Sequence, residues 1–222
     1  MMAAMWISLK LAAVTTALLL IVGVPLAWLL ACKRFRGRSL LEVLIALPLV
    51  LPPTVLGYYV LLLTAPSGLL GRAWQAMFDA SLAFSFSGMV LASLLYSLPF
   101  AVQPMLQAFR ALPEPWLELG RVQGLQGAAL LRRVVLPASR QGMLVAAGLA
   151  FAHTMGEFGA VLMVGGSIPG ETRVASIALF EFVEMGQGKQ ATMLALMLLG
   201  MSVLVLSLVY RRSPAMMAGM RP

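Results

Sequence analysis

Residues 11–32 read LAAVTTALLLIVGVPLAWLLAC, an uncharged apolar stretch that is followed at once by a basic cluster, KRFRGR, at residues 33–38. About 20 apolar residues are enough for a helix to cross the hydrocarbon core of a bilayer, so this stretch predicts a transmembrane helix. The whole chain has the same character, because 61% of its 222 residues are hydrophobic and only 11% are charged. Soluble proteins carry roughly a quarter charged residues. The composition therefore predicts an integral membrane protein and argues against a soluble enzyme, a nucleic-acid-binding module and a disordered linker.

Four further apolar stretches follow the first one, at residues 43–65, 82–109, 141–165 and 190–210. All are too long for buried strands, and none shows the two-residue alternation of a barrel strand. We therefore expect an all-α polytopic membrane protein with five transmembrane helices, in a single domain over residues 1–212. A disordered cytoplasmic tail is expected at 213–222. Residues 174–188 contain Glu181 and Glu184 and are expected to form a short external or re-entrant helix, with a sixth span as the alternative.

The basic residues lie mostly on one side of these spans. With five helices, twelve of the sixteen lysines and arginines fall on the side of the basic cluster, and only Lys10, Arg72, Arg173 and Lys189 fall on the other. Since basic residues accumulate in cytoplasmic loops, we expect the N-terminus outside and the C-terminus in the cytoplasm. The net charge of +8 then reflects membrane topology and contact with anionic lipid.

The longest cytoplasmic stretch, residues 110–140, has a pattern of its own. Residues 116–123 and 128–135 have helical composition, and Gly124 and Gly127 separate the two segments. Leu136-Pro137 is expected to end the second helix. A helix–turn–helix at the membrane surface fits either an amphipathic element on lipid or a docking surface for a cytoplasmic protein.

The spacing from Gly124 to Leu136-Pro137 resembles the cytoplasmic loop of ABC importer permeases. In that family, the loop supplies a short coupling helix that sits in a cleft of the ATP-binding subunit. The loop departs from the family signature, because the alanines of the signature are absent and Glu118 is displaced by one position. The resemblance implies coupling through Glu118, Leu119, Gly120, Gly124, Leu125, Leu130, Leu136 and Pro137.

Three other blocks resemble the molybdate permeases of the same family: residues 47–58, 156–160 and 168–173. The resemblance implies a multi-pass permease of the bacterial inner (plasma) membrane that carries molybdate into the cytoplasm. It also implies the partners: a second copy of the chain, two cytoplasmic ATP-binding subunits and a periplasmic molybdate-binding protein. Tungstate and sulfate permeases are close relatives, so the identity of the oxyanion stays open.

Two ionisable side chains, His153 and Glu157, lie deep inside a predicted span and share one helix face. Ionisable groups at membrane depth are costly and are functional candidates, and these two fit a structural pair, a gate or a proton relay. Direct contact with the substrate is a further alternative, against which the repulsion between a carboxylate and an oxyanion counts. Prolines at 52 and 53 break the second span, and glycines at 156 and 159, in the block that holds Glu157, allow close helix packing. Together they predict a translocation path or gate formed by Pro52, Pro53, Thr54, His153, Gly156, Glu157 and Gly159.

Two alternatives of other classes remain. A proton-coupled secondary transporter would use His153 and Glu157 directly, and a membrane anchor would transport nothing. The chain lacks a phosphate-binding loop of the Gly-x-x-x-x-Gly-Lys-Ser/Thr type. Its single cysteine and single histidine predict neither a disulfide nor a metal site. We therefore expect a transport subunit without an ATPase site, catalytic residues, metal or other cofactor.

The loop that follows the fourth span contains Pro169-Gly170, a pair typical of a type II turn. One acidic and one basic residue follow the turn on the outer side of the membrane. The resemblance implies that Pro169, Gly170, Glu171 and Arg173 face the binding protein.

Overall fold

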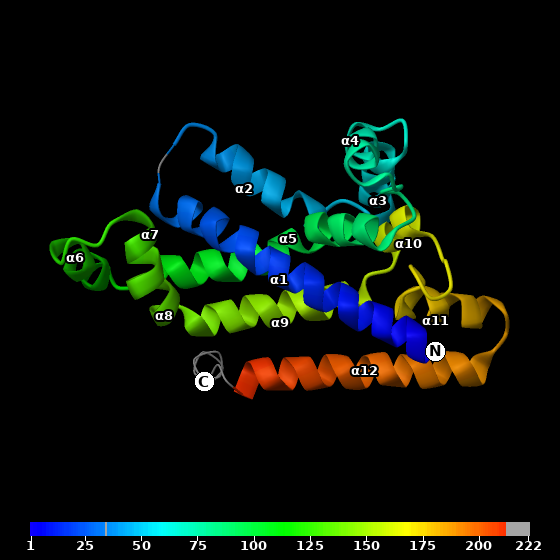
Figure 1. Cartoon of the computed structure of the whole chain (residues 1–222). Coiled ribbons are helices and arrows are strands. Elements are labelled where there is room, and N and C mark those ends of the chain that lie inside the picture. The colour runs from blue at the N-terminus through cyan, green and yellow to red at the C-terminus, as the bar shows by residue number, and fades with distance from the viewer. Residues whose placement is uncertain (34, 212–222) are drawn as a thin grey trace.

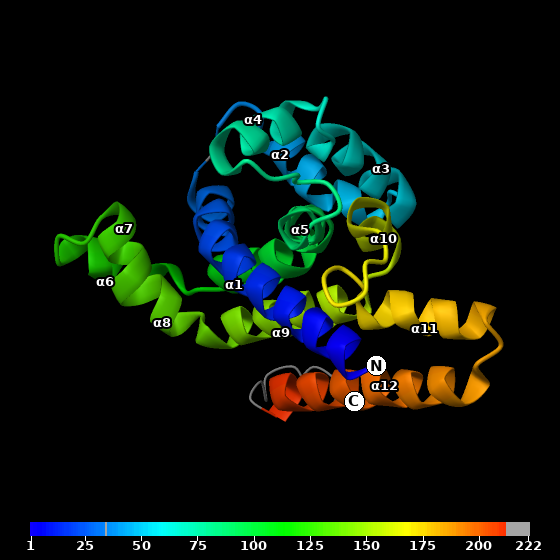
Figure 2. The same ribbon diagram turned by 45° about the vertical axis from the view of Figure 1, so that its right-hand side comes forward.

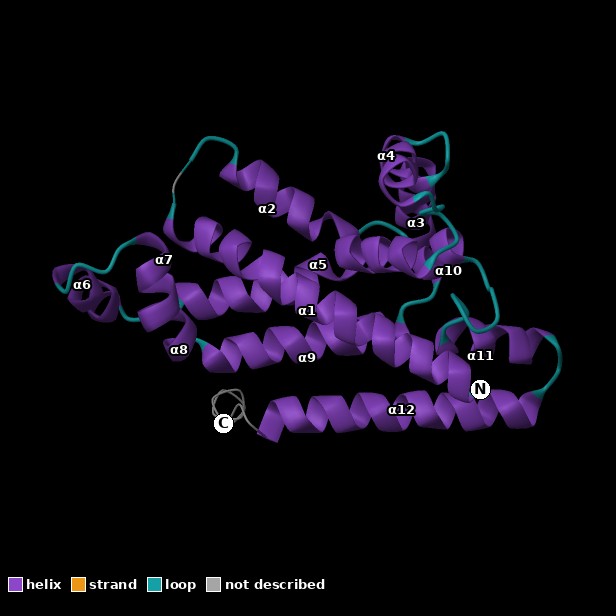
Figure 3. Cartoon of the chain, viewed as in Figure 1, coloured by secondary structure: helices purple, strands orange, loops and turns teal. Residues whose placement is uncertain are grey.

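The computed structural model describes residues 1–33 and 35–211, and this part of the chain contains helices and no strand (Figure 3). The tail expected at 213–222 lies outside the described residues. Three helices are long and apolar enough to cross a membrane: α1 (Met2–Cys32), α5 (Phe86–Arg110) and α12 (Gly188–Arg211). Two bent helix pairs raise that number to five if each pair is one span. The all-α polytopic architecture is confirmed.

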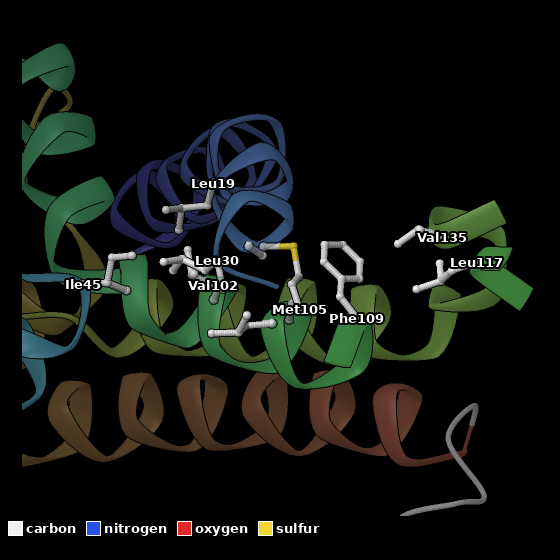
Figure 4. Close-up of a cluster of buried hydrophobic side chains, with 13 residues drawn as sticks. Leu19, Leu30, Ile45, Val102, Met105, Phe109, Leu117 and Val135 are labelled. Carbon is white, nitrogen blue, oxygen red and sulfur yellow. The ribbon is translucent and has the colours of Figure 1, made fainter. Parts of the chain in front are cut away.

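The centre of the fold is formed by α1, α5 and α9 (Arg140–Gly156), which pack against one another, while α12 packs on α9 (Figure 1). Leu19 of α1 and Val102 and Met105 of α5 belong to the same buried apolar cluster (Figure 4). Fully buried alanines on α5 and α9 complete it, because small side chains let helices approach closely in lipid. The cluster continues beyond the helix ends to Leu117 and Val135, so the 110–140 loop is packed onto the same core.

The first helix begins at Met2, before residue 11, where the first span is predicted to start. The prediction stopped at Lys10, which is charged. In the structure the Lys10 side chain is exposed, and its ammonium group lies 4.5 Å above the ring of Phe86. A lysine can extend its charge to the helix surface and bind an aromatic face, and therefore it does not end the helix.

The second predicted span is two helices and not one. Helix α2 (Arg38–Ala46) continues into a 3₁₀ turn, η1 (Leu47–Leu49), and α3 (Pro53–Thr64) follows at an angle of 111°. Proline lacks the backbone N–H that would continue the helical ladder. Consecutive prolines at 52 and 53 therefore end one helix and begin the next, and the carbonyl of Pro52 accepts the first hydrogen bonds of α3. A further short helix, α4 (Leu69–Phe78), packs on α3 and was not predicted separately.

The fourth predicted span is also divided. Helix α9 ends at Gly156, and α10 (Gly159–Gly165) begins after a break at residues 157–158. Helix α10 packs on α3 and α5, as Figure 2 shows from the side. Residues 174–188 contain the short helix α11 (Ala175–Glu184), which packs against α12.

The 110–140 loop folds into α6 (Glu114–Val122), α7 (Gly127–Leu130), a π-helical turn η2 (Leu131–Val135) and α8 (Leu136–Ala138). The predicted helix–turn–helix is present, and Gly124 and Gly127 have positive φ angles of 81° and 50° at its turn. Leu136-Pro137 does not end the second helix, which runs to Ala138 before the chain bends by 80° into α9. Pro137 lies in the first turn of the short α8, after the π-helical turn, and at that position the missing N–H of a proline is tolerated.

Candidate functional site

A cavity of about 510 Å³ lies where the two broken helices meet, between α3, α5 and the break between α9 and α10. Six of the seven residues predicted for the translocation path line it: Pro53, Thr54, His153, Gly156, Glu157 and Gly159. The seventh, Pro52, is exposed just before α3 and is not part of the lining. Tyr96, Ala152 and Phe158 complete the wall. The structure thus brings two blocks together that are about a hundred residues apart in the sequence.

A hydrogen bond from a neighbouring helix stabilises the break between α9 and α10. Glu157 adopts an extended conformation, with φ −65° and ψ 133°, and the hydroxyl of Ser176 on α11 donates a 2.5 Å hydrogen bond to its carbonyl oxygen. Broken helices leave backbone groups without a helical partner, and these groups are satisfied only where other protein groups or a cavity reach them. Helix α11 therefore fixes the position of Glu157 in the cavity wall.

Glycine allows the two helices beside the cavity to touch. A Cβ atom on Gly159 of α10 would lie 3.0 Å from the Cβ of Pro53, and one on Gly57 of α3 would lie 2.8 Å from the Cα of Ala160. The close packing predicted from the glycines thus occurs within one chain, between α3 and α10. Gly156 differs, because a Cβ atom there would meet nothing within 4 Å and would project into open space.

His153 is fixed by three contacts. Its Nδ1 lies 2.9 Å from the Oγ of Ser97, which in turn lies 3.0 Å from the hydroxyl of Thr154. The ring stacks on Phe100 at 3.9 Å between centroids and lies against Tyr96 at 4.9 Å. Ser97 and Thr154 were not predicted as site residues, although a buried histidine ring needs a hydrogen-bond partner such as a hydroxyl group.

Glu157 is almost completely buried, with 4% of its surface exposed, and both carboxyl oxygens lack a hydrogen-bond partner among the described residues. The hydroxyl of Ser93 on α5 is also buried and lies beside this carboxyl group, although the two groups do not meet hydrogen-bond geometry. His153 hydrogen-bonds to Ser97 instead, so no ion pair joins His153 and Glu157 among the described residues. His153 and Glu157 therefore both belong to the cavity wall but do not pair, and the carboxyl oxygens of Glu157 have almost no surface accessible from the cavity.

The residues predicted for coupling lie in the loop that extends beyond the helix ends, at the far left of Figure 1. Gly120 and Leu130 are buried and pack the loop together, since a Cβ atom on Gly120 would lie 2.6 Å from a methyl group of Leu130. Leu125 and Leu136 are half-buried, whereas Glu118, Leu119, Gly124 and Pro137 are exposed. Two exposed apolar side chains of α6, Trp116 and Val122, were not predicted as part of this surface.

The predicted type II turn is present after α10. The amide of Glu171 donates a 3.1 Å hydrogen bond to the carbonyl of Ile168, and Gly170 has a φ of 84°. Pro169, Gly170 and Glu171 are exposed. Arg173 is not a free surface charge, because it lies 2.6 Å from the carboxylate of Glu181 on α11, to which Ser167 also donates.

Comparison with known proteins identifies the family. Residues 23–217 match the family model described as binding-protein-dependent transport system inner membrane component. The chain is 46% identical to the molybdenum transport system permease protein ModB of Azotobacter vinelandii, over 94% of this chain and 92% of the relative. The corresponding protein of Escherichia coli K12 is 33% identical over 84% of this chain and 81% of the relative. The sulfate transport system permease protein CysT of Salmonella typhimurium is 31% identical over 83% of this chain and 66% of the relative.

The fold is that of ABC transporter permeases. The chain superimposes on a chain of the crystal structure of a bacterial alginate ABC transporter in complex with alginate pentasaccharide-bound periplasmic protein, with a TM-score of 0.75 and 14% identity. The match covers 97% of this chain and 78% of that chain. The chain therefore belongs to the family of binding-protein-dependent transport system inner membrane components.

Proposed function

We propose that this chain is the permease subunit of an ATP-driven importer that carries molybdate into the cytoplasm. The observation that carries the proposal is the cavity at the two helix breaks, because two blocks that resemble molybdate permeases, residues 47–58 and 156–160, meet there. The relatives named molybdenum transport permeases support molybdate as the substrate. The cavity residues, together with Pro52, form the proposed path or gate.

The permease works as a homodimer with two ATP-binding subunits, which dock on the 110–140 loop. Exposed apolar side chains on α6, namely Trp116, Leu119 and Val122, support this docking, because apolar groups on a loop outside the lipid need a protein partner. The basic residues of this loop and of residues 33–38 support its placement in the cytoplasm. In that orientation the N-terminus is periplasmic, and the binding protein docks near the turn at residues 168–171.

Transport then needs no bond chemistry in this subunit. ATP binding closes the two ATP-binding subunits, the docked loops transmit the closure, and the path opens outward to receive the anion from the binding protein. Hydrolysis returns the path to the inward-facing state. The partners act by changing the relative stability of two states of the permease.

The test is uptake of labelled molybdate into proteoliposomes that hold the permease, its ATP-binding subunit and the binding protein. We expect uptake that requires ATP and that excess tungstate reduces, whereas excess sulfate does not. Equal competition by sulfate would contradict the assignment to molybdate. Uptake that requires a proton gradient and ignores ATP would contradict the ABC importer and favour a secondary transporter.

A further inference from the structure

A groove of about 530 Å³ lies between α1, α4 and α5, and it shares no lining residue with the cavity at the helix breaks. Its lining is apolar apart from the hydroxyl of Ser87 and the indole N–H of Trp74. One face of α4 lines it, with residues at helical spacings of three and four: Leu70, Ala73, Trp74 and Met77. This face is open, since Met77 is 74% exposed and Leu70 38%. The groove therefore needs an apolar occupant from outside the described chain.

The groove follows α1 and α5 from one fixed contact. The ammonium of Lys10 on α1 lies 4.5 Å from the centre of the Phe86 ring at the start of α5. Both helices run from this contact toward the end of the molecule that carries α6 (Figure 1). Each helix lines the groove with side chains four and eight residues further along: Val14, Leu18, Val90 and Leu94. At about 1.5 Å per residue, the groove extends about 12 Å from Lys10.

The position of Lys10 gives the depth of this groove in the membrane. Residues 11–32 of α1 are uncharged and form about 33 Å of helix, close to the roughly 30 Å of a hydrocarbon core. Lys10 therefore lies at the level of the lipid headgroups. A groove of about 12 Å below it covers most of one leaflet, whose hydrocarbon layer is about 15 Å thick.

A smaller cavity of about 340 Å³ lies on the other side of the contact, and Lys10 and Phe86 both line it. Phe86 thus belongs to the apolar groove and to this cavity. Glu171, in the turn after α10, is the other charged residue of the lining, and both charged residues are exposed. Within residues 1–33 and 35–211, neither Lys10 nor Glu171 takes part in an ion pair. One cation and one anion at headgroup level are therefore available to a ligand.

We propose that α1, α4 and α5 bind one phospholipid, with a fatty acyl chain in the groove and the phosphate at Lys10. An apolar surface of a second copy would fill the groove, but it would leave the charge of Lys10 at the mouth of the groove unmatched, whereas a phospholipid matches both. The headgroup is zwitterionic, as in phosphatidylethanolamine, because its amine meets Glu171. In the orientation proposed above, this lipid belongs to the outer leaflet. The site is separate from the transport path and does not depend on which anion is carried.

The test is native mass spectrometry of the purified complex of permease and ATP-binding subunit, stripped of lipid in detergent and titrated with dioleoyl phosphatidylethanolamine. We expect one tightly bound lipid per permease chain. Lys10→Gln should weaken binding about fivefold, the effect of one basic side chain at a membrane surface. Lys189→Gln, at an exposed lysine outside both cavities, is its control. Ala73→Phe, which fills the groove, should weaken binding at least as much, whereas Ala76→Phe on the same helix lies outside the lining and should not. Dioleoyl phosphatidylglycerol should bind less tightly to the wild type, and Glu171→Gln should reduce this difference.

Equal lipid binding by Lys10→Gln and Lys189→Gln, or by Ala73→Phe and Ala76→Phe, would overturn the proposal. Equal binding of the two lipids by the wild type would overturn the zwitterionic headgroup. The same spectra report the permease dimer. A wild type that binds no lipid, with a dimer that Ala73→Phe dissociates, would assign the groove to a second copy and overturn the lipid site. Lipid binding is measured without substrate, ATP or binding protein, so its failure leaves the proposed transport function standing, and a failure of molybdate uptake leaves the lipid site standing.

Discussion

Arg110, the last residue of α5, donates a 2.7 Å hydrogen bond to Glu42 on α2. Glu42 also accepts a 3.2 Å hydrogen bond from Arg38 on its own helix. This ion pair therefore connects α2, the first helix of the bent pair α2–α3, to Arg110, where the 110–140 loop starts. A displacement of the start of that loop would therefore act on α2 through this contact.

A double-mutant cycle measures the strength of this connection. Glu42→Gln and Arg110→Gln, separately and together, should give a coupling of about 0.5–1 kcal/mol in the free energy of unfolding, because both side chains are about one-third exposed. The pair Arg121–Glu114, which is more exposed, is the control and should give less. Unfolding by denaturant in detergent micelles reports both values, and a coupling indistinguishable from zero for Glu42 and Arg110 would contradict the link.

Two serines on α5 should respond differently to the same substitution. Ser97→Ala removes a buried hydroxyl that both His153 and Thr154 use, and we expect it to lower the free energy of unfolding by about 1–3 kcal/mol. Ser93→Ala, four residues earlier and equally buried, removes a hydroxyl that lies beside the Glu157 carboxyl without hydrogen-bond geometry, and it should lower the free energy of unfolding less than Ser97→Ala does. Thermal unfolding of the two variants in one detergent makes the comparison, and equal losses would refute the hydrogen-bonded chain.

The contact between α3 and α10 depends on the absence of a side chain at Gly57. Gly57→Ala places a Cβ atom 2.8 Å from the backbone of Ala160, and we expect destabilisation of about 1–3 kcal/mol from overpacking. Gly200→Ala on α12 meets no atom within 4 Å and should stabilise the helix by about 0.5–1 kcal/mol. Opposite signs in the unfolding free energy are the expected result, and a stable Gly57→Ala protein would show that α3 moves freely over α10.

Gly124 can be tested against Gly170, a glycine with a similar φ angle at the other end of the molecule. Gly124→Leu and Gly170→Leu both place a side chain at a φ above 80°, at a cost of about 1–2 kcal/mol each. We expect Gly124→Leu to lose the ATP-binding subunit or to uncouple ATP hydrolysis from uptake, with membrane insertion intact. Gly170→Leu should retain the ATP-binding subunit. Co-purification and ATP-dependent uptake distinguish them, and normal coupled uptake by Gly124→Leu would refute the docking assignment.

The helical architecture followed directly from the apolar stretches, whereas the helix ends did not. Lys10 was read as the boundary of the first helix, and only the packing of its ammonium group on Phe86 explains why the helix continues past it. The prolines at 52 and 53 indicated a disruption of the second span. The 111° angle depends on the packing of α3 against α10, and such a contact between distant segments leaves no periodicity in the sequence.

The candidate site was predicted as two separate blocks. Each block carried a local signal, prolines at 52–53 and ionisable groups at 153 and 157, but no local signal could place them on one cavity. Tyr96 was missed because a single tyrosine in an apolar helix is common, although it forms part of the wall. Arg173 was expected to be available to a partner, and its ion pair with Glu181 depends on how α11 folds back.

The break between α2 and α3 and the break between α9 and α10 lie beside the same cavity. They divide each helix pair into two parts at the level of the cavity. On one side of the breaks, α3 and α10 are packed together as a pair, and on the other side α2 and α9 each pack on α5. The non-helical residues 50–52 and 157–158 join this pair to the preceding helices, so a change of angle at these residues leaves the helical hydrogen bonds intact. A continuous helix would tilt along its whole length and would displace both ends at once. If the path opens at one face of the membrane at a time, these two breaks are the places where the bundle can bend without unwinding a helix.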